Sequence, residues 1–515
     1  METHRGQWKS KMGFILAASG SAIGLGNIVF FSANAYRFGG GAFYLPYFIA
    51  LFLVGIPVMV LEFALGHSMR RAFPQSMNRA VGRKGEFLGW WAIFNASFIT
   101  MYYITILAWV VGMFLGAFGA LWRASIPVPS FGMAEGDLAN PYAYFFSMVS
   151  SWKTVGCVVF VWTLNAYVVR RGAGTIESAV RVFVPLMWIF MLILLVRGVT
   201  LDNGGQGVLY LFTPNMEAMK NPDVWQGAFS QIFFSLSLGF GILTAYASYL
   251  PPKSDQVNNA VLTSTLNCGF EYIAGITVFA ILFAFAMVPR ASTLSMMFFI
   301  VPQGISQLPG GSPAVIAFGL VFFVLLFLAG LSSSVSLVEA LVSAIVDKFK
   351  SSRRRAILGF SIVGLAGSLC FALPMVVDPS LEGNGTLGLT LLDLFDHWAF
   401  SHGLLIVGLL ECILIGWVYG IRKLEDHVHA TSKFRLGPTY PILIKFLIPA
   451  LIVILLVFSV RNEFVDGLYG HQLASPSGPG WLSVLPTFAV LLWIAASVVA
   501  AAVFTFRGRY DDEKS

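Results

Sequence analysis

The stretch Gly20-Ser21-Ala22-Ile23-Gly24-Leu25-Gly26-Asn27 lies inside an apolar segment, residues 12–31, that is long enough to cross a bilayer. A simple membrane anchor would have leucine or valine at these positions. The glycines indicate backbone that leaves the helix, which is tolerated at membrane depth only where protein or a watery cavity satisfies it. A second interruption, Gln231-Ile-Phe-Phe-Ser-Leu-Ser-Leu-Gly-Phe-Gly241, follows later. Paired interruptions of this kind indicate the binding site of a secondary transporter.

The composition is typical of an integral membrane protein. Hydrophobic residues make up 57% of the 515 residues and charged residues 11%, whereas soluble proteins carry about 25% charge. We expect an all-α membrane protein of about twelve transmembrane helices. The apolar spans are residues 12–36, 42–68, 88–122, 152–169, 177–198, 224–249, 258–289, 313–348, 356–376, 390–420, 439–460 and 481–506.

Clusters of basic residues follow alternate spans, so all of them fall on one side of the membrane. They are Arg5 to Lys11, Arg70 to Lys84, Arg170-Arg171, Lys348 to Arg355, Arg422-Lys423 and Arg507-Arg509. Because basic loops stay in the cytoplasm, both termini are predicted to be cytoplasmic. The net charge of +7 therefore reports topology and gives no basic face for nucleic acid. Short tails favour a prokaryotic inner membrane.

Enzymatic and ATP-driven functions lack sequence support. The chain shows no phosphate-binding loop, metal-ligand cluster or catalytic-triad pattern, so we expect no enzyme. Its four cysteines all fall within predicted helices, which makes a disulfide framework improbable.

If the interrupted helices are the first and the sixth, helices 1–5 and 6–10 are two halves of odd helix number. When each of two consecutive repeats contains an odd number of membrane-spanning helices, the two repeats must have opposite orientations in the membrane. We therefore predict a 5+5 inverted repeat over residues 1–200 and 201–421, with peripheral helices 11 and 12 and a cytoplasmic tail over 422–515. The alternative is a bundle without repeats whose glycines fall there by chance.

Several spaced motifs resemble the neurotransmitter:sodium symporter family, and most closely its bacterial, leucine-transporter-like amino-acid branch. They include Arg5, Trp8, Gly20 to Asn27, Gly39 to Phe43, Pro46-Tyr47, Gly55 to Glu62, Tyr102-Tyr103, Asn267, Ala329 to Ser334, and Asp393 with Asp396. The resemblance covers nearly the whole chain. It implies sodium-coupled symport by alternating access, with helices 1 and 6 unwound at their centres.

The resemblance implies two sodium sites built from oxygen ligands, which alkali cations require. In the first site the substrate carboxylate completes the shell and so couples ion to solute. Serine stands at 235 and 332 where threonine is familiar, and the hydroxyl is retained. The alternative is that the serines at 332 to 334 merely allow tight helix packing. The implied ligands are Ala22, Asn27, Ser235 and Asn267 in one site, and Gly20, Ile23, Ala329, Ser332 and Ser333 in the other.

The resemblance also implies an amino-acid site between the unwound segments. The free N–H groups of Leu25 and Gly26 suit a carboxylate, with the Tyr103 hydroxyl as a further donor. Relatives that carry amines tend to have aspartate at the position of Gly24, so glycine favours an amino acid. The apolar lining suits a neutral, hydrophobic side chain. The implied substrate-binding residues are Ser21, Ala22, Gly24, Leu25, Gly26, Ile99, Tyr103, Phe234, Ser235, Ser237, Phe240, Ser333 and Leu337.

Glu271 is an ionisable residue inside the seventh span, one turn past Asn267. Carboxylates within a membrane are costly and by default functional. Chloride-dependent relatives have serine at the matching position. We therefore expect Glu271 to supply the negative charge, making transport chloride-independent, with proton antiport if it reprotonates on the return step. The alternative is a structural carboxylate bonded to polar neighbours.

The family's inner gate matches Arg5 and Asp347, with Trp8 and Tyr249 around the ion pair. The outer gate departs from the family pattern of Trp-Arg-Phe-Pro after the sodium-binding asparagine. Phe30 stands at the arginine position. We expect an aromatic plug of Phe30 with Tyr103 and Phe234.

The acidic partner of the missing gate arginine persists as Asp396. Arg37 and His397 are candidate substitutes for the cation. Alternatively Asp396 faces a cationic part of the substrate, which would favour an osmolyte or an amine. A ligand sensor or ion-leak pathway that does not transport is a third hypothesis. The expected partners are the amino acid, sodium, the lipid bilayer and a second copy in a homodimer.

Overall fold

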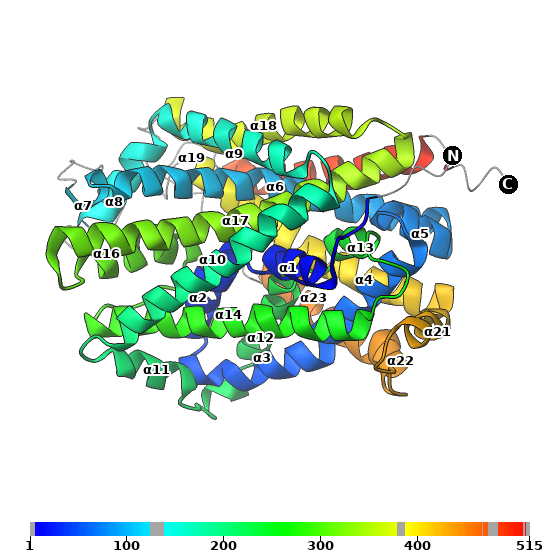
Figure 1. Cartoon of the computed structure of the whole chain (residues 1–515), viewed down its shortest axis with the longest axis horizontal. Coiled ribbons are helices and arrows are strands. Elements are labelled where there is room, and N and C mark those ends of the chain that lie inside the picture. Colours follow the sequence, from blue (N-terminus) through cyan, green and yellow to red (C-terminus); the bar gives the residue numbers. More distant parts are fainter. Residues whose placement is uncertain are drawn as a thin grey trace.

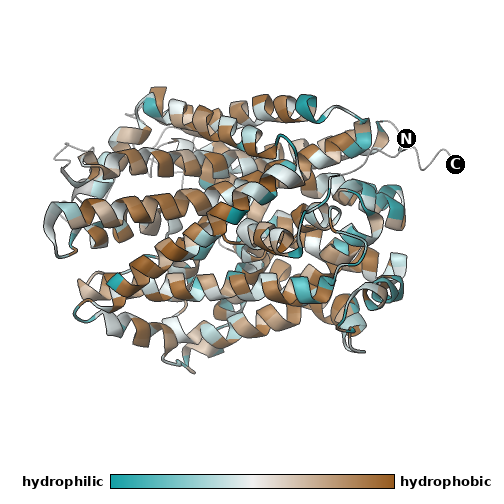
Figure 2. Ribbon diagram, in the orientation of Figure 1, coloured by the Kyte–Doolittle hydropathy of each residue, from teal (hydrophilic) through white to brown (hydrophobic). Residues whose placement is uncertain are grey.

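The computed structural model describes residues 6–123, 139–377, 387–465, 467–471, 483–507 and 510, and within these ranges the chain is helical with no strand. Nine helices in this part are long and apolar enough to cross a membrane, or up to eleven if each bent pair is one span. The helices form one elongated bundle (Figure 1). Hydrophobic residues run along their lengths, and hydrophilic residues gather toward the ends (Figure 2).

The long helices follow the predicted spans. The uninterrupted ones are α6 Arg83–Ala117, α9 Lys153–Val169, α10 Ala173–Val199, α14 Gln256–Ala284, α17 Gly311–Phe349 and α18 Arg353–Val377. Others contain a π-helical turn, in which the backbone hydrogen bond joins residue i to i+5. These are α3 Tyr44–Ala50 with η3 Leu51–Gly55 and α4 Ile56–Met69; α19 Leu387–Asp396 with η6 His397–Leu404, α20 Leu405–Ile413, η7 Leu414–Gly420 and α21 Ile421–Thr431; α22 Tyr440–Ile442 with η8 Leu443–Leu447 and α23 Ile448–Val465; and α24 Leu485–Ile494 with η11 Ala495–Val499 and α25 Ala500–Phe506.

Short helices fill the connections, and the sequence pattern had not indicated them. They are η2 Gly40–Ala42, α5 Phe73–Val81, α7 Ala120–Arg123, α8 Ala139–Val149, α11 Gly204–Phe212, η4 Ala218–Lys220, α15 Thr293–Ser295, η5 Met296–Ile300 and α16 Val301–Ser306. α5 and α21 lie at one end of the bundle, and α7, α8 and α11 lie at the other (Figure 1). We call the first the basic end, because Arg70, Arg71 and Lys423 accompany those helices.

Both predicted interruptions are present. Helix 1 consists of α1 Lys11–Ala22, then η1 Gly26–Phe30 and α2 Phe31–Arg37, and its two halves meet at an angle of 56°. Helix 6 consists of α12 Pro222–Ser235 and α13 Ile242–Ala247. Between its halves the φ angle is positive at three residues: 56° at Ser237, 77° at Gly239 and 74° at Gly241. Glycine adopts such backbone at no steric cost, whereas Ser237 is strained there.

A buried carboxylate supports the unwound part of helix 6. Glu62 Oε1 on α4 accepts a hydrogen bond from Gly239 N at 2.9 Å. Gly66, one turn further along α4, lies against α13, where a Cβ would come within 2.1 Å of the Thr244 carbonyl oxygen. Glycine at this position therefore lets α4 lie directly against the inner half of helix 6.

Helices 11 and 12 are among the least buried of the apolar helices. Only 28% of the apolar window of Tyr440–Val465 and 22% of that of Leu485–Phe506 is buried. α23 packs against α20, and α25 packs against α6. In contrast, α1 is surrounded by α10, α13, α14 and α17, which places the break of helix 1 in the centre of the bundle.

Candidate functional site

A cavity lies between the two interrupted helices and the middles of α6 and α17. Its free volume is about 30 Å³, enough for about two water molecules. Most of the predicted substrate-binding residues line it, whereas Leu25 and Ser235 lie outside the lining. The lining residues are Ser21, Ala22, Gly24, Gly26, Asn27, Ile99, Tyr103, Phe234, Ser237, Phe240, Ile242, Ser333, Ser336 and Leu337.

One end of the cavity presents backbone N–H groups and hydroxyls. Leu25 N donates a hydrogen bond to the Tyr103 hydroxyl at 3.2 Å. A Cβ at Gly24 would lie 2.9 Å from both the Tyr103 and the Ser333 hydroxyl oxygens. Glycine at this position therefore keeps the start of the outer half-helix accessible to an anionic group.

The predicted first sodium-site side chains lie together. Asn27 Nδ2 donates to Asn267 Oδ1 at 2.8 Å and approaches Ser235 Oγ at 3.4 Å. Asn267 Nδ2 also donates to Ser235 Oγ. Asn27 Oδ1 accepts from Gly24 N at 2.8 Å. All three side chains are buried, so helix 1, α12 and α14 are joined here by polar groups that include oxygen donors.

The predicted second sodium site also comes together, between α1 and α17. A Cβ at Gly20 would lie 3.6 Å from Ser332 Cβ. Ser332 Oγ donates to Ala329 O at 2.9 Å, and Ser333 Oγ donates to Ser21 O at 2.9 Å. Ile23, at the C-cap of α1, is fully buried. The residues at this contact offer carbonyl and hydroxyl oxygens, which are the kind of ligand that alkali cations require.

Glu271 on α14 lies within hydrogen-bonding reach of polar groups from two other elements, α3 and α12. The Tyr47 hydroxyl donates to Glu271 Oε2, and Gln231 Nε2 donates to Oε1 at 2.7 Å. Asn34 Nδ2 in turn donates to Gln231 Oε1 at 3.0 Å. The Glu271 side chain is fully buried, and the described ion pairs do not include it.

The aromatic cover of the cavity differs from the expected plug of Phe30, Tyr103 and Phe234. Phe30 packs edge-on against Phe234 and Phe400, with ring centroids 5.7 and 6.0 Å away. Phe234 and Phe400 lie 4.4 Å apart. We call Phe30, Phe234 and Phe400 the outer lid. Tyr103 instead turns its hydroxyl to Leu25, and the third ring comes from the π-helical turn η6.

In the part of the chain that the structure describes, neither Arg37 nor His397, the two expected cations, pairs with Asp396. His397 Nε2 pairs with Glu463 Oε1 at 2.7 Å, and Arg37 lies over the ring of Phe38 at 5.4 Å. Among the described residues, no ion pair includes Asp396. Asp396 is also absent from the cavity lining, so it does not face the proposed substrate.

At the basic end, Arg5 of the predicted inner gate lies outside the described residues. Its predicted partner Asp347 accepts a hydrogen bond from Ala72 N at 2.7 Å. Trp8 is buried, its Nε1 donates to Tyr246 O at 2.8 Å, and its backbone N donates to Tyr249 O at 3.1 Å. Trp8 and Tyr249 therefore lie together, as expected.

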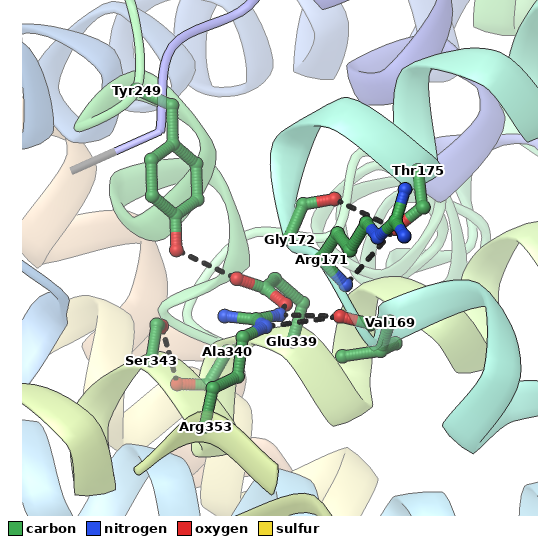
Figure 3. Close-up of polar contacts among 9 residues, drawn as sticks. All are labelled: Val169, Arg171, Gly172, Thr175, Tyr249, Glu339, Ala340, Ser343 and Arg353. Atoms are coloured by element: carbon green, nitrogen blue, oxygen red, sulfur yellow. Dashed lines mark hydrogen bonds and ion pairs between the residues drawn. The ribbon is translucent and has the colours of Figure 1, made fainter. Parts of the chain in front are cut away.

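An ion pair that the sequence had not indicated lies beside Tyr249 (Figure 3). Arg353, at the start of α18, pairs with the fully buried carboxylate of Glu339 on α17. The Tyr249 hydroxyl donates to Glu339 Oε1 at 2.6 Å. Arg353 Nη2 also donates to Val169 O at 2.8 Å, at the end of α9. One arginine thus joins helices 4, 8 and 9 to the end of helix 6.

Replacing Arg353 with alanine is expected to destabilise the protein by about 3–5 kcal/mol, because it leaves the Glu339 carboxylate buried without its cation. Arg354→Ala is the matched control, since Arg354 is exposed and adjacent in sequence. The apparent melting temperature of purified protein measures the effect. Equal melting of the two variants would mean that the ion pair does not stabilise this end.

The sequence did not indicate Phe400 of the outer lid. It also did not indicate two residues of the cavity lining, Ile242 and Ser336. Ser336 Oγ lies 2.6 Å from Ser21 Oγ, one helical turn beyond Ser332, so the spacing of the serines on α17 could have pointed to it. Ile242 begins α13 directly after the positive-φ glycine at 241. Its isolated aliphatic side chain gives no signal in an apolar sequence.

Comparison with known proteins agrees with this geometry. Residues 5–124 and 146–507 match the Sodium:neurotransmitter symporter family. An uncharacterized sodium-dependent transporter from Methanocaldococcus jannaschii is 38% identical over 91% of this chain and 93% of its own length. The sodium- and chloride-dependent GABA transporter 2 of Homo sapiens is 28% identical, covering 93% of this chain and 84% of the relative.

The crystal structure of MhsT in complex with L-phenylalanine superposes with a TM-score of 0.76. Its sequence is 28% identical, and the alignment covers 88% of this chain and 100% of MhsT. The helical fold therefore has a counterpart in the solved structure of MhsT, which holds L-phenylalanine.

Proposed function

The chain belongs to the sodium:neurotransmitter symporter family, whose members are secondary transporters and not enzymes, and on that premise we propose that it is a chloride-independent sodium symporter of a neutral, hydrophobic amino acid. It works by alternating access. The observation that carries this proposal is the cavity between the interrupted helices, with backbone N–H groups and the Tyr103 hydroxyl at one end and apolar side chains elsewhere.

The amino acid's carboxylate binds at the start of the outer half of helix 1, near the Leu25 and Gly26 amides. Its ammonium group meets the Ala22 and Phe234 carbonyls and the Ser237 hydroxyl. The side chain lies among Ile99, Phe240, Leu337 and the other apolar lining residues. No charged side chain is in the lining, which favours a neutral substrate.

Two sodium ions are bound as co-substrates. The first lies among Asn27, Asn267 and Ser235 and shares the substrate carboxylate, and the second lies at the contact of Gly20 with Ser332. To offer its oxygen to the first ion, the Asn27 amide turns away from Gly24 N, which it now caps. Binding of the sodium ion thereby frees the Gly24 N–H group to donate to the substrate carboxylate. The ion and the amino acid therefore each favour binding of the other.

We place the basic end of the bundle in the cytoplasm of a prokaryotic cell, following the positive-inside rule. The outer lid then faces the outside. Trp8 and Tyr249 lie on the cytoplasmic route, with the predicted Arg5–Asp347 gate. Substrate enters past the outer lid and leaves past these residues.

The decisive experiment is a thermal-shift screen of purified protein with single amino acids in Na⁺ or in K⁺. A hydrophobic amino acid should raise the melting temperature only in Na⁺, because the ion and the ligand bind the folded state together. Uptake of that amino acid into proteoliposomes should then require an inward sodium gradient. Stabilisation without uptake or counterflow would indicate a sensor. Stabilisation by amines or osmolytes instead would indicate the other substrate class.

Replacing Gly24 with aspartate is expected to abolish uptake of the amino acid. The new carboxylate would lie against the Tyr103 and Ser333 hydroxyls, which a Cβ alone approaches to 2.9 Å, and would repel the substrate carboxylate. Amine analogues that lack a carboxylate should compete better in this variant than in the parent. Competition against radiolabelled substrate measures both, with the exposed Gly205→Asp as control.

A further inference from the structure

We propose that His397, His402 and Glu463 form a binding site for a transition-metal ion of the Zn²⁺ class, separate from the sodium sites. One ligand atom from each side chain lies within 4.8 Å of the others. His397 and His402 belong to η6 of helix 10, and Glu463 lies near the end of α23 in helix 11. A metal there would join helices 10 and 11, which already meet through the His397–Glu463 contact.

The π-helical turn brings the two histidines together. Five residues along an ordinary α-helix would place the second side chain well away from the first. In η6 the hydrogen bond joins residue i to i+5, so both histidines face the same way. Their ring centroids lie 4.9 Å apart.

Neighbouring groups orient the ligand atoms. His402 Nδ1 is 3.3 Å from His397 O, a contact typical of metal-binding histidines. His402 Nε2 lies 3.0 Å from Ser459 Oγ, a hydroxyl that a metal ion at Nε2 would displace. His397 Nε2 lies 2.7 Å from Glu463 Oε1. The other carboxylate oxygen accepts from Tyr469 N at 2.7 Å, and the Tyr469 ring stacks on His397 at 3.8 Å.

The ligand chemistry selects the ion. Two imidazoles and one carboxylate suit Zn²⁺ and similar transition metals, with water in a fourth position, whereas Mg²⁺ and Ca²⁺ prefer oxygen alone. The side chains of His397 and Glu463 are 17% and 13% exposed, so an ion can reach them.

The test uses the full-length protein in lipid nanodiscs, purified with a tag that contains no histidine. Micromolar ZnCl₂ should raise the apparent melting temperature, and the same concentration of MgCl₂ should not. His402→Ala and Glu463→Gln should each weaken the apparent Zn²⁺ affinity by about 100-fold or more, since even outer partners of metal ligands contribute about 10- to 100-fold.

Two controls locate the ion. His471→Ala removes an exposed imidazole close to Tyr469 and should leave the Zn²⁺ response unchanged. His427→Ala tests the other histidine pair, in which His67 Nδ1 lies 2.8 Å from His427 Nε2 near the basic end. A Zn²⁺ response that survives His402→Ala, or that is lost in His427→Ala, would overturn the proposal.

A cysteine variant covers the case in which the alanine variant does not fold. His402→Cys keeps a ligand at the same position and should respond to Cd²⁺ better than the parent does, because thiolate is a softer donor. An unchanged preference between Cd²⁺ and Zn²⁺ would count against the site. None of these readouts requires transport, so their failure is distinguishable from failure of the proposed function.

The site has a consequence for the outer lid. Phe400 lies between the two histidines on η6. A metal bound to both histidines and to Glu463 would hold this turn against helix 11 and keep the outer lid closed. This step rests on the proposed function. Zn²⁺ should therefore slow sodium-driven uptake in the parent and not in His402→Ala; equal inhibition of both would overturn the link to the outer lid.

Discussion

Replacing Asn27 with alanine is expected to abolish sodium-dependent substrate binding, with a loss in apparent affinity of about 100-fold or more. The side chain contacts the unwound backbone through Gly24 N and contacts α14 through Asn267 Oδ1, both at 2.8 Å. Its loss removes an oxygen ligand and leaves two buried polar groups without a partner. Each such group costs about 1–3 kcal/mol, and 1.4 kcal/mol corresponds to about tenfold in affinity.

The measurement is equilibrium binding of the radiolabelled substrate across a sodium titration. Asn165→Ala is the matched control, because Asn165 is equally buried but lies on α9, where its Nδ2 bonds to Val161 O at 3.0 Å. The control should keep its sodium dependence. If Asn27→Ala binds substrate with unaltered sodium dependence, the first ion is not held at this position.

The breaks in helices 1 and 6 could be predicted because their cause is local. Glycines at 20, 24 and 26 in an apolar span conflict with a continuous membrane helix, and the structure bends there. In helix 6 the glycines at 239 and 241 have positive φ. The adjoining Ser237 also has positive φ, and no property of serine would have indicated it.

The parts that could not be predicted depend on helix register and on contacts between distant segments. A π-helical turn such as η6 has no residue signature, so the packing of Phe400 against Phe30 and Phe234 was missed. The same turn moves His397 toward Glu463, 66 residues later, and away from a pairing with Asp396. Aromatic residues are frequent in these apolar helices, and only the folded structure separates those that cover the cavity from those that pack against lipid or the core.

Replacing Glu271 with serine is expected to make transport depend on chloride. The carboxyl group accepts hydrogen bonds from Tyr47 and Gln231 one helical turn from Asn267, and in the proposed function it supplies the negative charge there. Without it, the charge of the bound sodium is uncompensated in a buried site, where opposite charges interact strongly. The smaller serine leaves the Tyr47 and Gln231 donors directed at space that an anion can enter.

Uptake by Glu271→Ser should therefore be at least about tenfold faster in chloride than in gluconate, which corresponds to about 1.4 kcal/mol of compensation. The parent should transport equally in both media. Glu217→Ser, an exposed site paired with Lys220, should behave as the parent does. Chloride dependence already present in the parent would show that Glu271 does not supply the charge, and its hydrogen bonds to Tyr47 and Gln231 would then serve only to hold helices 2, 6 and 7 together.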